Sequence, residues 1–284
     1  MRKEVKQLFM PLIYGKTVIT MASDIRNIFG SLLCVKDHYL LAKLCESFWR
    51  NKYPDIANLM KLINQIGWFS SVLDKPIQYS ISFFTIAQDY RKLNKAYISV
   101  YDRVCKKRCR VTLQVSTLDR DKHKNQVATC VNFIHQKYAF IAMKVVELLA
   151  LKKAPVYTIH DNFITTAVFA TLVPKIYTRV FMEMGAPLRI INEFISMNLN
   201  LPIDWLNDPI PGDELRTHLL SLVPNNLRKN DNIKLSKNIE ETVICYSLYV
   251  NTVCGKHNYE DKWYTFYAHL DSWDSIGFNY NVHY

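Results

Sequence analysis

Residues 2–15 have the sequence RKEVKQLFMPLIYG, in which apolar side chains recur at the spacing of an amphipathic helix. Arg2 and Lys6 stand four residues apart and therefore share one face of that helix. Two cations held together suit the triphosphate of a nucleotide, although such a pair is also common on a solvated face. Tyr14 stands at the predicted helix end, where its ring can stack on a base or sugar, and Gly15 lets the backbone turn sharply.

The second informative segment, residues 156–166, has the sequence VYTIHDNFITT. Two short apolar runs flank His160, Asp161 and Asn162, a pattern typical of a β-hairpin with an aspartate at its tip. A carboxylate at such a tip is exposed and rigidly held, as a magnesium ligand must be. Asp and Asn also favour turns for conformational reasons, so this segment alone indicates no more than a turn.

Taken together and in this order, the two segments resemble the fingers and palm motifs of bacteriophage-type single-subunit DNA-directed RNA polymerases, of the mitochondrial or mitochondrial-plasmid branch. The resemblance covers most of residues 1–184 and corresponds to the C-terminal part of such an enzyme. In that family the arginine and the lysine contact the nucleotide phosphates, and the tyrosine helps to distinguish ribonucleotides from deoxyribonucleotides. By position, the residues that would bind the nucleotide are Arg2, Lys6, Met10, Tyr14 and Gly15.

The palm motif of the family binds the catalytic metals, so the resemblance implies a catalytic, metal-binding role for Asp161 and a supporting role for His160. Lys6 is the other residue to which it assigns a catalytic role. Mg²⁺ is the implied cofactor, because two-metal nucleotidyl transfer needs carboxylates that hold two ions. The first aspartate of the family precedes the fingers motif, and no residue of this sequence takes its place. The resemblance leaves open a fragment, a partial sequence, or a split enzyme whose N-terminal part is a separate chain.

The resemblance implies addition of ribonucleotides to an RNA 3′ end on a DNA template. The implied partners are template DNA, nascent RNA and ribonucleoside triphosphates, without a membrane. The expected fold class is α+β and mostly helical, with the fingers and palm subdomains of a right-hand polymerase and a small antiparallel palm sheet. The expected division is a fingers-like helical segment at 1–75, a fingers and palm segment with the His-Asp hairpin at 76–184, and a C-terminal palm extension at 185–284.

A weaker resemblance lies between the two motifs. Leu113 and Gln114, followed by the sequence NFIH at residues 132–135, resemble a stretch that lines the polymerase active site near the nascent base pair. His135 would face the minor groove there, as a nucleic-acid-binding residue. A histidine at the edge of the core explains the same position equally well.

Family A DNA polymerases share the fingers motif, so the choice between the two classes depends on details. Met10 and Asn162 are closer to the residues of RNA polymerases, whereas DNA polymerases usually carry an aromatic residue and a glutamate there. A third interpretation is a non-catalytic, basic, nucleic-acid-binding remnant, which the missing first aspartate favours.

The composition agrees with a polyanionic partner. Lysine and arginine number 36 against 25 acidic residues, which gives a net charge of +11 and a pI near 9.2. The cluster of Lys106, Lys107, Arg108 and Arg110 is a candidate for contacts with backbone phosphates, although a solvated surface explains any one of these charges better. Seven cysteines without zinc-site spacing predict reduced thiols, and the lack of a long apolar run predicts a soluble protein. Abundant Lys, Asn, Ile and Tyr are typical of AT-rich genomes, which favours a mitochondrial location.

The periodicity also predicts the remaining elements. Helices are expected at 3–14, 24–45, 55–66, 134–152, 166–184 and 187–198. Strands are expected within 76–85 and 110–115, and a polar loop at 120–130.

Overall fold

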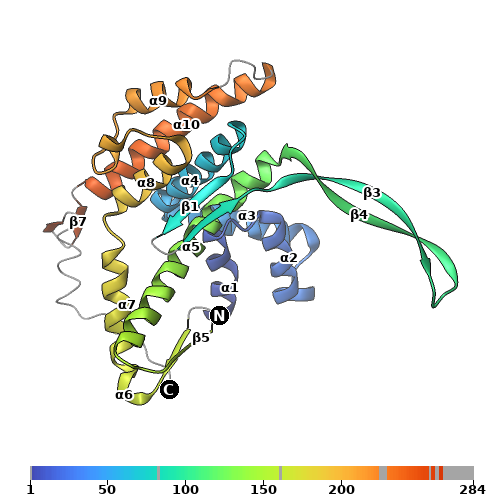
Figure 1. The fold of residues 1–284 in the computed structure, drawn as a ribbon, viewed down its shortest axis with the longest axis horizontal. Helices are drawn as coiled ribbons and strands as arrows, with labels where there is room; N and C mark the ends of the chain where they lie inside the picture. The colour runs from blue at the N-terminus through green and yellow to red at the C-terminus, as the bar shows by residue number, and fades with distance from the viewer. Residues whose placement is uncertain are drawn as a thin grey trace.

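The computed structural model describes residues 2–81, 84–159, 162–223, 229–255, 257–259 and 262–264. Most of these residues are helical, and the described strands form two-stranded antiparallel sheets (Figure 1). The predicted class, α+β and mostly helical with small antiparallel sheets, is therefore confirmed. Within the described residues, no helix is both long enough and apolar enough to cross a bilayer.

The elements follow in chain order. The helices are α1 (Arg2–Ile13), α2 (Val18–Phe29), α3 (Val35–Lys52), α4 (Pro54–Val72), α5 (Lys122–Leu151), α6 (Ala167–Ala170), α7 (Leu172–Glu183), α8 (Pro187–Leu199), α9 (Gly212–Ser221) and α10 (Lys229–Cys254), with short 3₁₀ turns at η1 (Gly30–Leu32) and η2 (Ile203–Trp205). The hairpins are β1 (Ile77–Ile81) with β2 (Phe84–Gln88), β3 (Arg91–Asp102) with β4 (Lys107–Arg120), β5 (Val156–Ile159) with β6 (Asn162–Thr165), and β7 (His257–Tyr259) with β8 (Lys262–Tyr264).

The main core lies between α4, α8, α9, α10 and the N-terminal half of α5, with β1 packed against it. Its largest fully buried side chains include Trp68, Tyr79 and Tyr246. Helices α4 and α5 approach very closely, because a Cβ atom at Gly67 would overlap the side chain of Thr129. A glycine is thus required at this crossing, because it allows α5 to pack closely against α4.

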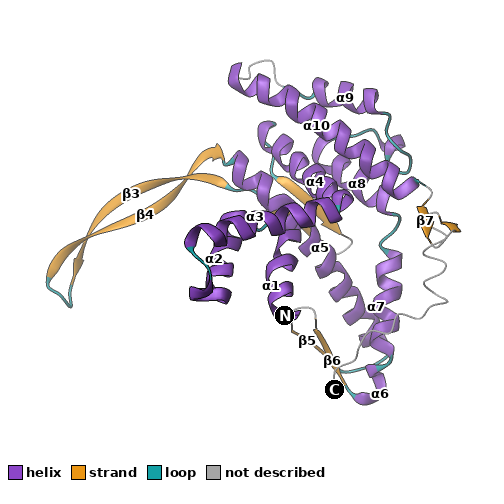
Figure 2. Ribbon diagram, turned by 180° about the vertical axis from the view of Figure 1, so that it is seen from behind, coloured by secondary structure: helices purple, strands orange, loops and turns teal. Residues whose placement is uncertain are grey.

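Two smaller apolar clusters complete the interior. One joins α1, α2 and α3 through Met21, Ile25 and Trp49. The other joins the C-terminal half of α5 to α7 and to the β5–β6 hairpin, with Ile141 and Val180 at its centre. Helix α5 therefore takes part in two cores and runs from the main core to the β5–β6 hairpin (Figure 2).

Two helix predictions were wrong in their bounds. The single helix expected at 24–45 is interrupted, because Gly30 ends α2 with a positive φ of 48° and Cys34 begins α3 in a capping box with Asp37. The helix expected at 166–184 is likewise divided into α6 and α7 at Thr171.

The polar loop expected at 120–130 was also wrong, because this segment forms the first turns of α5. Asp121 caps the helix, since its side chain accepts a hydrogen bond of 2.9 Å from the backbone N–H of Lys124. Asn125 and Thr129 are buried and form hydrogen bonds, so their polarity reflects an internal network and no loop.

The longest hairpin, β3 with β4, projects from the body as a two-stranded ribbon (Figure 1). The sequence predicted only its second strand, at 110–115, and missed the strand from Arg91 to Asp102. No residue of either strand is buried. Among the described residues, β3 and β4 make extensive contacts only with each other.

Candidate functional site

Two residues predicted from separate motifs meet at the junction of α1 and α5. The ring of Tyr14 lies edge-on to the ring of His135, with 5.8 Å between their centroids and 71° between their planes. Tyr14 is half-buried and His135 is exposed, so this aromatic pair lies at the surface of the body. The sequence suggested both residues independently, and the fold brings them together.

The end of α1 explains how Tyr14 is held. The backbone N–H groups of Tyr14 and Lys16 both donate to the carbonyl of Pro11, at 3.1 and 3.0 Å. Gly15 adopts a positive φ of 74°, which favours glycine, and its hypothetical Cβ would lie 3.9 Å from the carbonyl oxygen of Val127 on α5. The sharp turn therefore brings the end of α1 directly against α5.

The two faces of α1 have different surroundings. Leu8 and Leu12 are buried in the cluster with α2 and α3. Lys6, Met10 and Tyr14 recur every four residues and therefore lie along the other face, where Lys6 and Met10 are exposed. The predicted nucleotide-binding residues thus share one accessible face that ends at the Tyr14–His135 pair. The side chain of Arg2 lies outside the described residues, although its backbone begins α1.

Lys16, next to the turn, has an acidic partner. It forms an ion pair with Asp24 of α2, and burial lowers the pKa of Lys16 below its usual range. The lysine next to the turn therefore ties α1 to α2, whereas Lys6 is exposed to solvent.

A buried polar network fixes the N-terminal half of α5, which carries His135. The hydroxyl of Tyr79 donates to Oε1 of Gln88 at 2.7 Å, and Nε2 of Gln88 donates to the carbonyl of Asn125 at 2.9 Å. Asn132, one turn before His135, donates to the same Gln88 oxygen. Burial raises the pKa of Tyr79 well above its usual range, so its hydroxyl keeps its proton for this network. The network was not predicted, because nothing in the sequence links these polar residues.

The predicted palm hairpin has the expected strands, with Ile159 paired to Asn162 at its end. His160 and Asp161 lie outside the described residues, so their predicted roles stay predictions. Both views draw this hairpin and the beginning of α1 toward the same end of the molecule (Figures 1 and 2). Among the described residues, no group of three or more His, Cys, Asp or Glu side chains could hold a metal ion.

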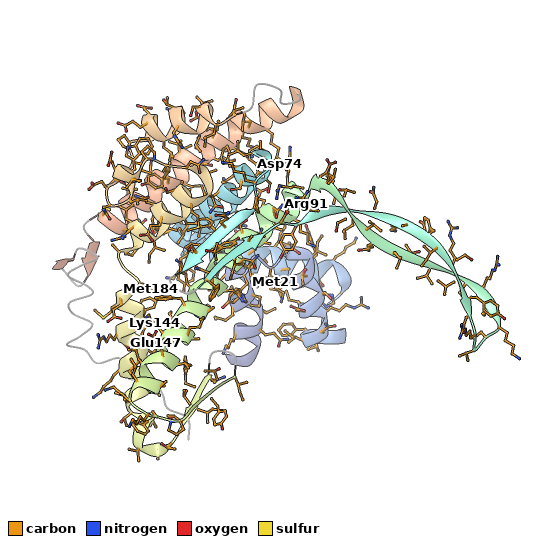
Figure 3. The ribbon with its side chains drawn as sticks, in the orientation of Figure 1. Met21, Asp74, Arg91, Lys144, Glu147 and Met184 are labelled. Carbon is orange, nitrogen blue, oxygen red and sulfur yellow. The ribbon has the colours of Figure 1, made fainter. Side chains whose placement is uncertain are left out.

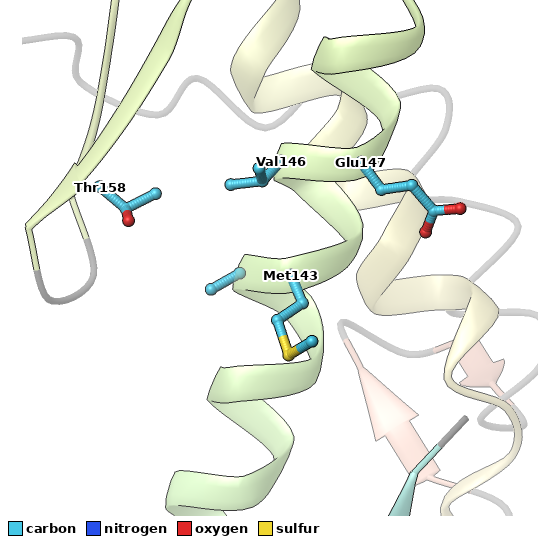
Figure 4. Close-up of a pocket in the computed structure, with 5 residues that line it drawn as sticks. Met143, Val146, Glu147 and Thr158 are labelled. Carbon is cyan, nitrogen blue, oxygen red and sulfur yellow. The ribbon is translucent and has the colours of Figure 1, made fainter. Parts of the chain in front are cut away.

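A cavity of about 370 Å³ lies between α5 and β5 (Figure 4). Its walls are mostly apolar, with Met143 and Val146 on α5 opposite Thr158 on β5. Among the described lining residues Glu147 is the ionisable one, and its carboxylate pairs with Lys144 at 2.8 Å. None of the described lining residues is a cation that could bind a nucleotide phosphate.

One face of the β3–β4 ribbon is basic and aromatic. In the strand register, Ser99 pairs with Arg110 and Tyr101 pairs with Arg108, and Tyr97 lies on the same face. The guanidinium of Arg110 lies 4.0 Å from the centroid of the Tyr97 ring. The sequence suggested Arg108 and Arg110 as phosphate contacts but missed the tyrosines, although the alternation of 97, 99 and 101 was a usable signal.

The opposite face of the ribbon is apolar. It carries the register pairs of Ile98 with Val111 and of Ala96 with Leu113. Ile98, Val111 and Leu113 are exposed. The ribbon thus presents a basic, aromatic face and a face with several apolar pairs, and the arginines of the first face suit a polyanion.

Comparison with known proteins gives one informative similarity. No family model matches the chain. The chain is 32% identical over 211 residues to a protein of Zea mays named "Probable DNA-directed RNA polymerase", a match that covers 71% of this chain. The chain spans 19% of the length of that relative. The similarity supports the relation to RNA polymerases that the two motifs indicated.

Proposed function

We propose that this chain is the C-terminal catalytic segment of a phage-type, single-subunit DNA-directed RNA polymerase, of the mitochondrial or mitochondrial-plasmid branch. The observation that carries the proposal is the contact between Tyr14 and His135, beside the α1 face that carries Lys6. Motifs separated by more than a hundred residues form one surface, as a nucleotide site requires. The similarity to the maize protein supports the same class of enzyme.

The proposed roles follow from the positions on α1 and α5. Lys6, with Arg2 one turn earlier, would bind the triphosphate, because charge-assisted hydrogen bonds to phosphate are strong. Tyr14 at the end of this face would contact the sugar, and Met10 and Gly15 would shape the space around it. His135 would contact the nascent base pair from the other side of the Tyr14 ring.

Asp161 would ligate Mg²⁺, and its neighbour His160 would support it. The described residues offer no complete set of metal ligands, so a second carboxylate would have to come from outside them. When bound, the ion supplies charge stabilisation at the reacting phosphate. The residues of this chain would bind and orient the nucleotide beside it.

The β3–β4 ribbon would contact the DNA template. A two-stranded β-ribbon fits the major groove of duplex DNA, which is about 12 Å wide. Arg108 and Arg110 on one face offer phosphate contacts, and Tyr97 and Tyr101 on the same face offer rings for stacking. The net charge of +11 agrees with such a partner.

Primer extension on a DNA template with Mg²⁺ tests the proposal. The chain would be assayed alone and together with a polypeptide that covers the part of the maize relative upstream of the matched region. Incorporation of ribonucleotides is expected. Incorporation of deoxyribonucleotides alone would favour a family A DNA polymerase, and salt-sensitive DNA binding without extension would favour a non-catalytic remnant.

Lys6→Ala tests the phosphate contact. We expect the KM for the nucleotide to rise roughly 10- to 100-fold, the effect of losing a charge-assisted hydrogen bond. Lys43→Ala, on an exposed part of α3, is the matched control and should leave the KM unchanged. Equal effects of the two substitutions would contradict the role of Lys6.

Tyr14→Phe tests the sugar contact, because it keeps the ring against His135 and removes only the hydroxyl. The preference for ribonucleotides over deoxyribonucleotides should fall by about tenfold, as expected for the loss of one neutral hydrogen bond. An unchanged preference would exclude this role.

Asp161→Ala should abolish extension while leaving DNA binding intact, and surviving extension would disprove the palm assignment.

A further inference from the structure

The β3–β4 ribbon is long and is attached to the body at one end (Figure 1). Strand β3 spans 12 residues, which at about 3.3 Å per residue places the tip roughly 36 Å from the root. An angular error of about 10° at the root would displace the tip by roughly 6 Å, which exceeds the ~3.4 Å step between successive base pairs. Something at the root must therefore fix the direction of the ribbon if its tip is to meet a defined partner.

A cluster of four charged side chains occupies this root. Asp74 follows α4, Asp89 precedes β3, and Arg91 and Arg120 are the register partners that begin β3 and end β4. Figure 3 shows Asp74 and Arg91 where the ribbon leaves the body. Two cations and two carboxylates make the cluster neutral as a whole.

Arg120 is the centre of this cluster. Its side chain is only 8% exposed, and its Nε donates to Oδ1 of Asp74 at 2.8 Å. A terminal nitrogen of the same guanidinium donates to Oδ1 of Asp89. The planar guanidinium holds its donors in a fixed fork, so two carboxylates on different segments define the orientation of the end of β4.

Asp89 also joins the two strands. Its Oδ2 accepts hydrogen bonds from Nε and a terminal nitrogen of Arg91, at 3.1 and 2.9 Å. Arg91 in turn donates to the carbonyl of Leu118 on β4 at 2.6 Å. One carboxylate therefore contacts the arginines of both strands, and Asp74 connects this pair to the body.

A neutral contact anchors the segment just before β3 to α5. The side-chain amide of Asn125 accepts from the N–H of Tyr90 and donates to its carbonyl, both at 3.1 Å. This contact sets the position of the root, whereas the charged cluster lies where the two strands diverge from the body. The charged cluster bridges both strands of the ribbon to the end of α4.

We propose that Arg120 is a positioning residue that fixes the direction of the β3–β4 ribbon through Asp74 and Asp89. Its functional consequence rests on the proposed function, in which the ribbon contacts template DNA. The geometric consequence is independent of that role, because it concerns only the distance between the tip of the ribbon and the body.

Distances between two spin labels test the geometric consequence in the full chain. One label replaces Val104, which is near the tip and 91% exposed, and the other replaces Glu214, which is exposed on α9. Both labels are carried by non-natural amino acids, so the native cysteines stay unchanged. We expect Arg120→Gln to broaden the distance distribution by several ångströms. Arg179→Gln removes an exposed i,i+4 ion pair on α7 and is the matched control.

Asp74→Asn is the second variant, in case Arg120→Gln does not fold. Asp74 is 82% exposed, so its substitution leaves the core intact while it weakens one of the two contacts to Arg120. An intermediate broadening is expected, and Arg120→Lys should resemble it because a point charge lacks the fork. A distribution that stays at the wild-type width in Asp74→Asn and in any folded Arg120 variant would overturn the proposal.

Affinity for duplex DNA separates this proposal from the proposed function. We expect Arg120→Gln to weaken binding several-fold at every salt concentration, because the phosphate-contacting arginines of the ribbon remain in place. A broadened distance distribution with unchanged DNA affinity would support the positioning role of Arg120 and refute the DNA-contacting role of the ribbon. An unchanged distribution would refute the positioning role whatever the affinity.

Discussion

The helical body and the β3–β4 ribbon are held together by different forces. The body buries large apolar side chains such as Trp68 and Tyr246 between α4, α5, α8 and α10. The ribbon buries none of its strand residues and consists of a single backbone ladder from Arg91 to Arg120. A two-stranded hairpin of this kind is marginally stable in water without support.

Because of this difference, we expect substitutions in the body and substitutions in the ribbon to change different properties of the protein. Substitutions in the body should act on the free energy of unfolding, because burial supplies most of the folding free energy. Substitutions along the ribbon should act on binding or on the direction of the ribbon and leave global stability nearly unchanged. Substitutions in the body, at the junction, along the ribbon and at its tip test whether the two regions respond independently.

Trp68→Ala should have the largest effect. Trp68 is 1% exposed at the centre of the main core, and truncation of a buried tryptophan costs about 3–5 kcal/mol. Denaturant unfolding monitored by circular dichroism would measure the change. A loss below about 1 kcal/mol would show that the body does not depend on this core in the way that its burial indicates.

Gln88→Ala tests the junction between body and ribbon. Its amide accepts from Tyr79 and donates to the carbonyl of Asn125, and all three residues are buried. Removal leaves buried polar groups without this partner, so a loss of about 1–3 kcal/mol in the free energy of unfolding is expected. Ser80→Ala, which removes an exposed hydroxyl pair with Thr85, is the control and should be nearly neutral.

The sequence predicted the body better than the ribbon, and the reason is physical. The helices expected at 55–66 and 187–198 correspond to α4 and α8, because their apolar residues recur at the period of a helix with one buried face. In β3 the residues Lys95, Tyr97, Ser99 and Tyr101 alternate with Ala96, Ile98 and Val100, and neither face is buried. Without a buried face, the alternation gave a weak signal and the strand was missed.

The loop expected at 120–130 shows a second limit. Polar residues usually indicate solvent, but Asn125 and Thr129 form hydrogen bonds inside the protein. The partner of the Asn125 side chain is the backbone of Tyr90, and Thr129 packs against Gly67 of α4, so both environments come from other segments. Such tertiary contacts leave no local pattern in the sequence.

The candidate site was predicted residue by residue but not as an arrangement. Motif positions identified Tyr14 and His135 separately, and only the crossing of α1 with α5 places their rings 5.8 Å apart. The cluster around Arg120 was not predicted at all. Its partners Asp74 and Asp89 lie 46 and 31 residues away, so the neighbours of Arg120 in the sequence give no sign of them.

Ile98→Ser should have only a small effect on global stability. Ile98 is 42% exposed on the apolar face of the ribbon and pairs across the ladder with Val111. The loss of one cross-strand pair costs less than about 1 kcal/mol. Hydrogen exchange should show faster exchange of the neighbouring β3 and β4 amides, with unchanged protection in α4 and α5. Reduced protection in α4 would mean that the ribbon and the body unfold as one unit.

Asp102 at the tip of the ribbon provides the smallest and most local test. Its Oδ1 accepts the N–H groups of Val104 at 2.8 Å and Cys105 at 3.1 Å. The backbone N–H of Cys105 is the main cause that holds the pKa of Asp102 below its ordinary value of 3.8, with smaller contributions from the Cys105 thiol and from the N–H of Val104. The order of the turn should therefore be complete above pH 3.8 and should be lost as the pH falls through the lower pKa of the folded state.

Amide chemical shifts of Val104 and Cys105, recorded by NMR between neutral and acidic pH, would follow this transition. Asp102→Asn keeps an acceptor oxygen without a titrating charge, so its amide shifts should lack the transition altogether. Amides of α4, measured in the same spectra, should not follow the midpoint of the tip, because the tip projects away from the helical body (Figure 1). A midpoint at or above the ordinary pKa of aspartate would mean that these hydrogen bonds do not favour the charged carboxylate. If the amide shifts of the tip and of α4 changed at the same pH, the ribbon and the body would not be independent. Protonation of one residue at the tip would then alter the structure of the core.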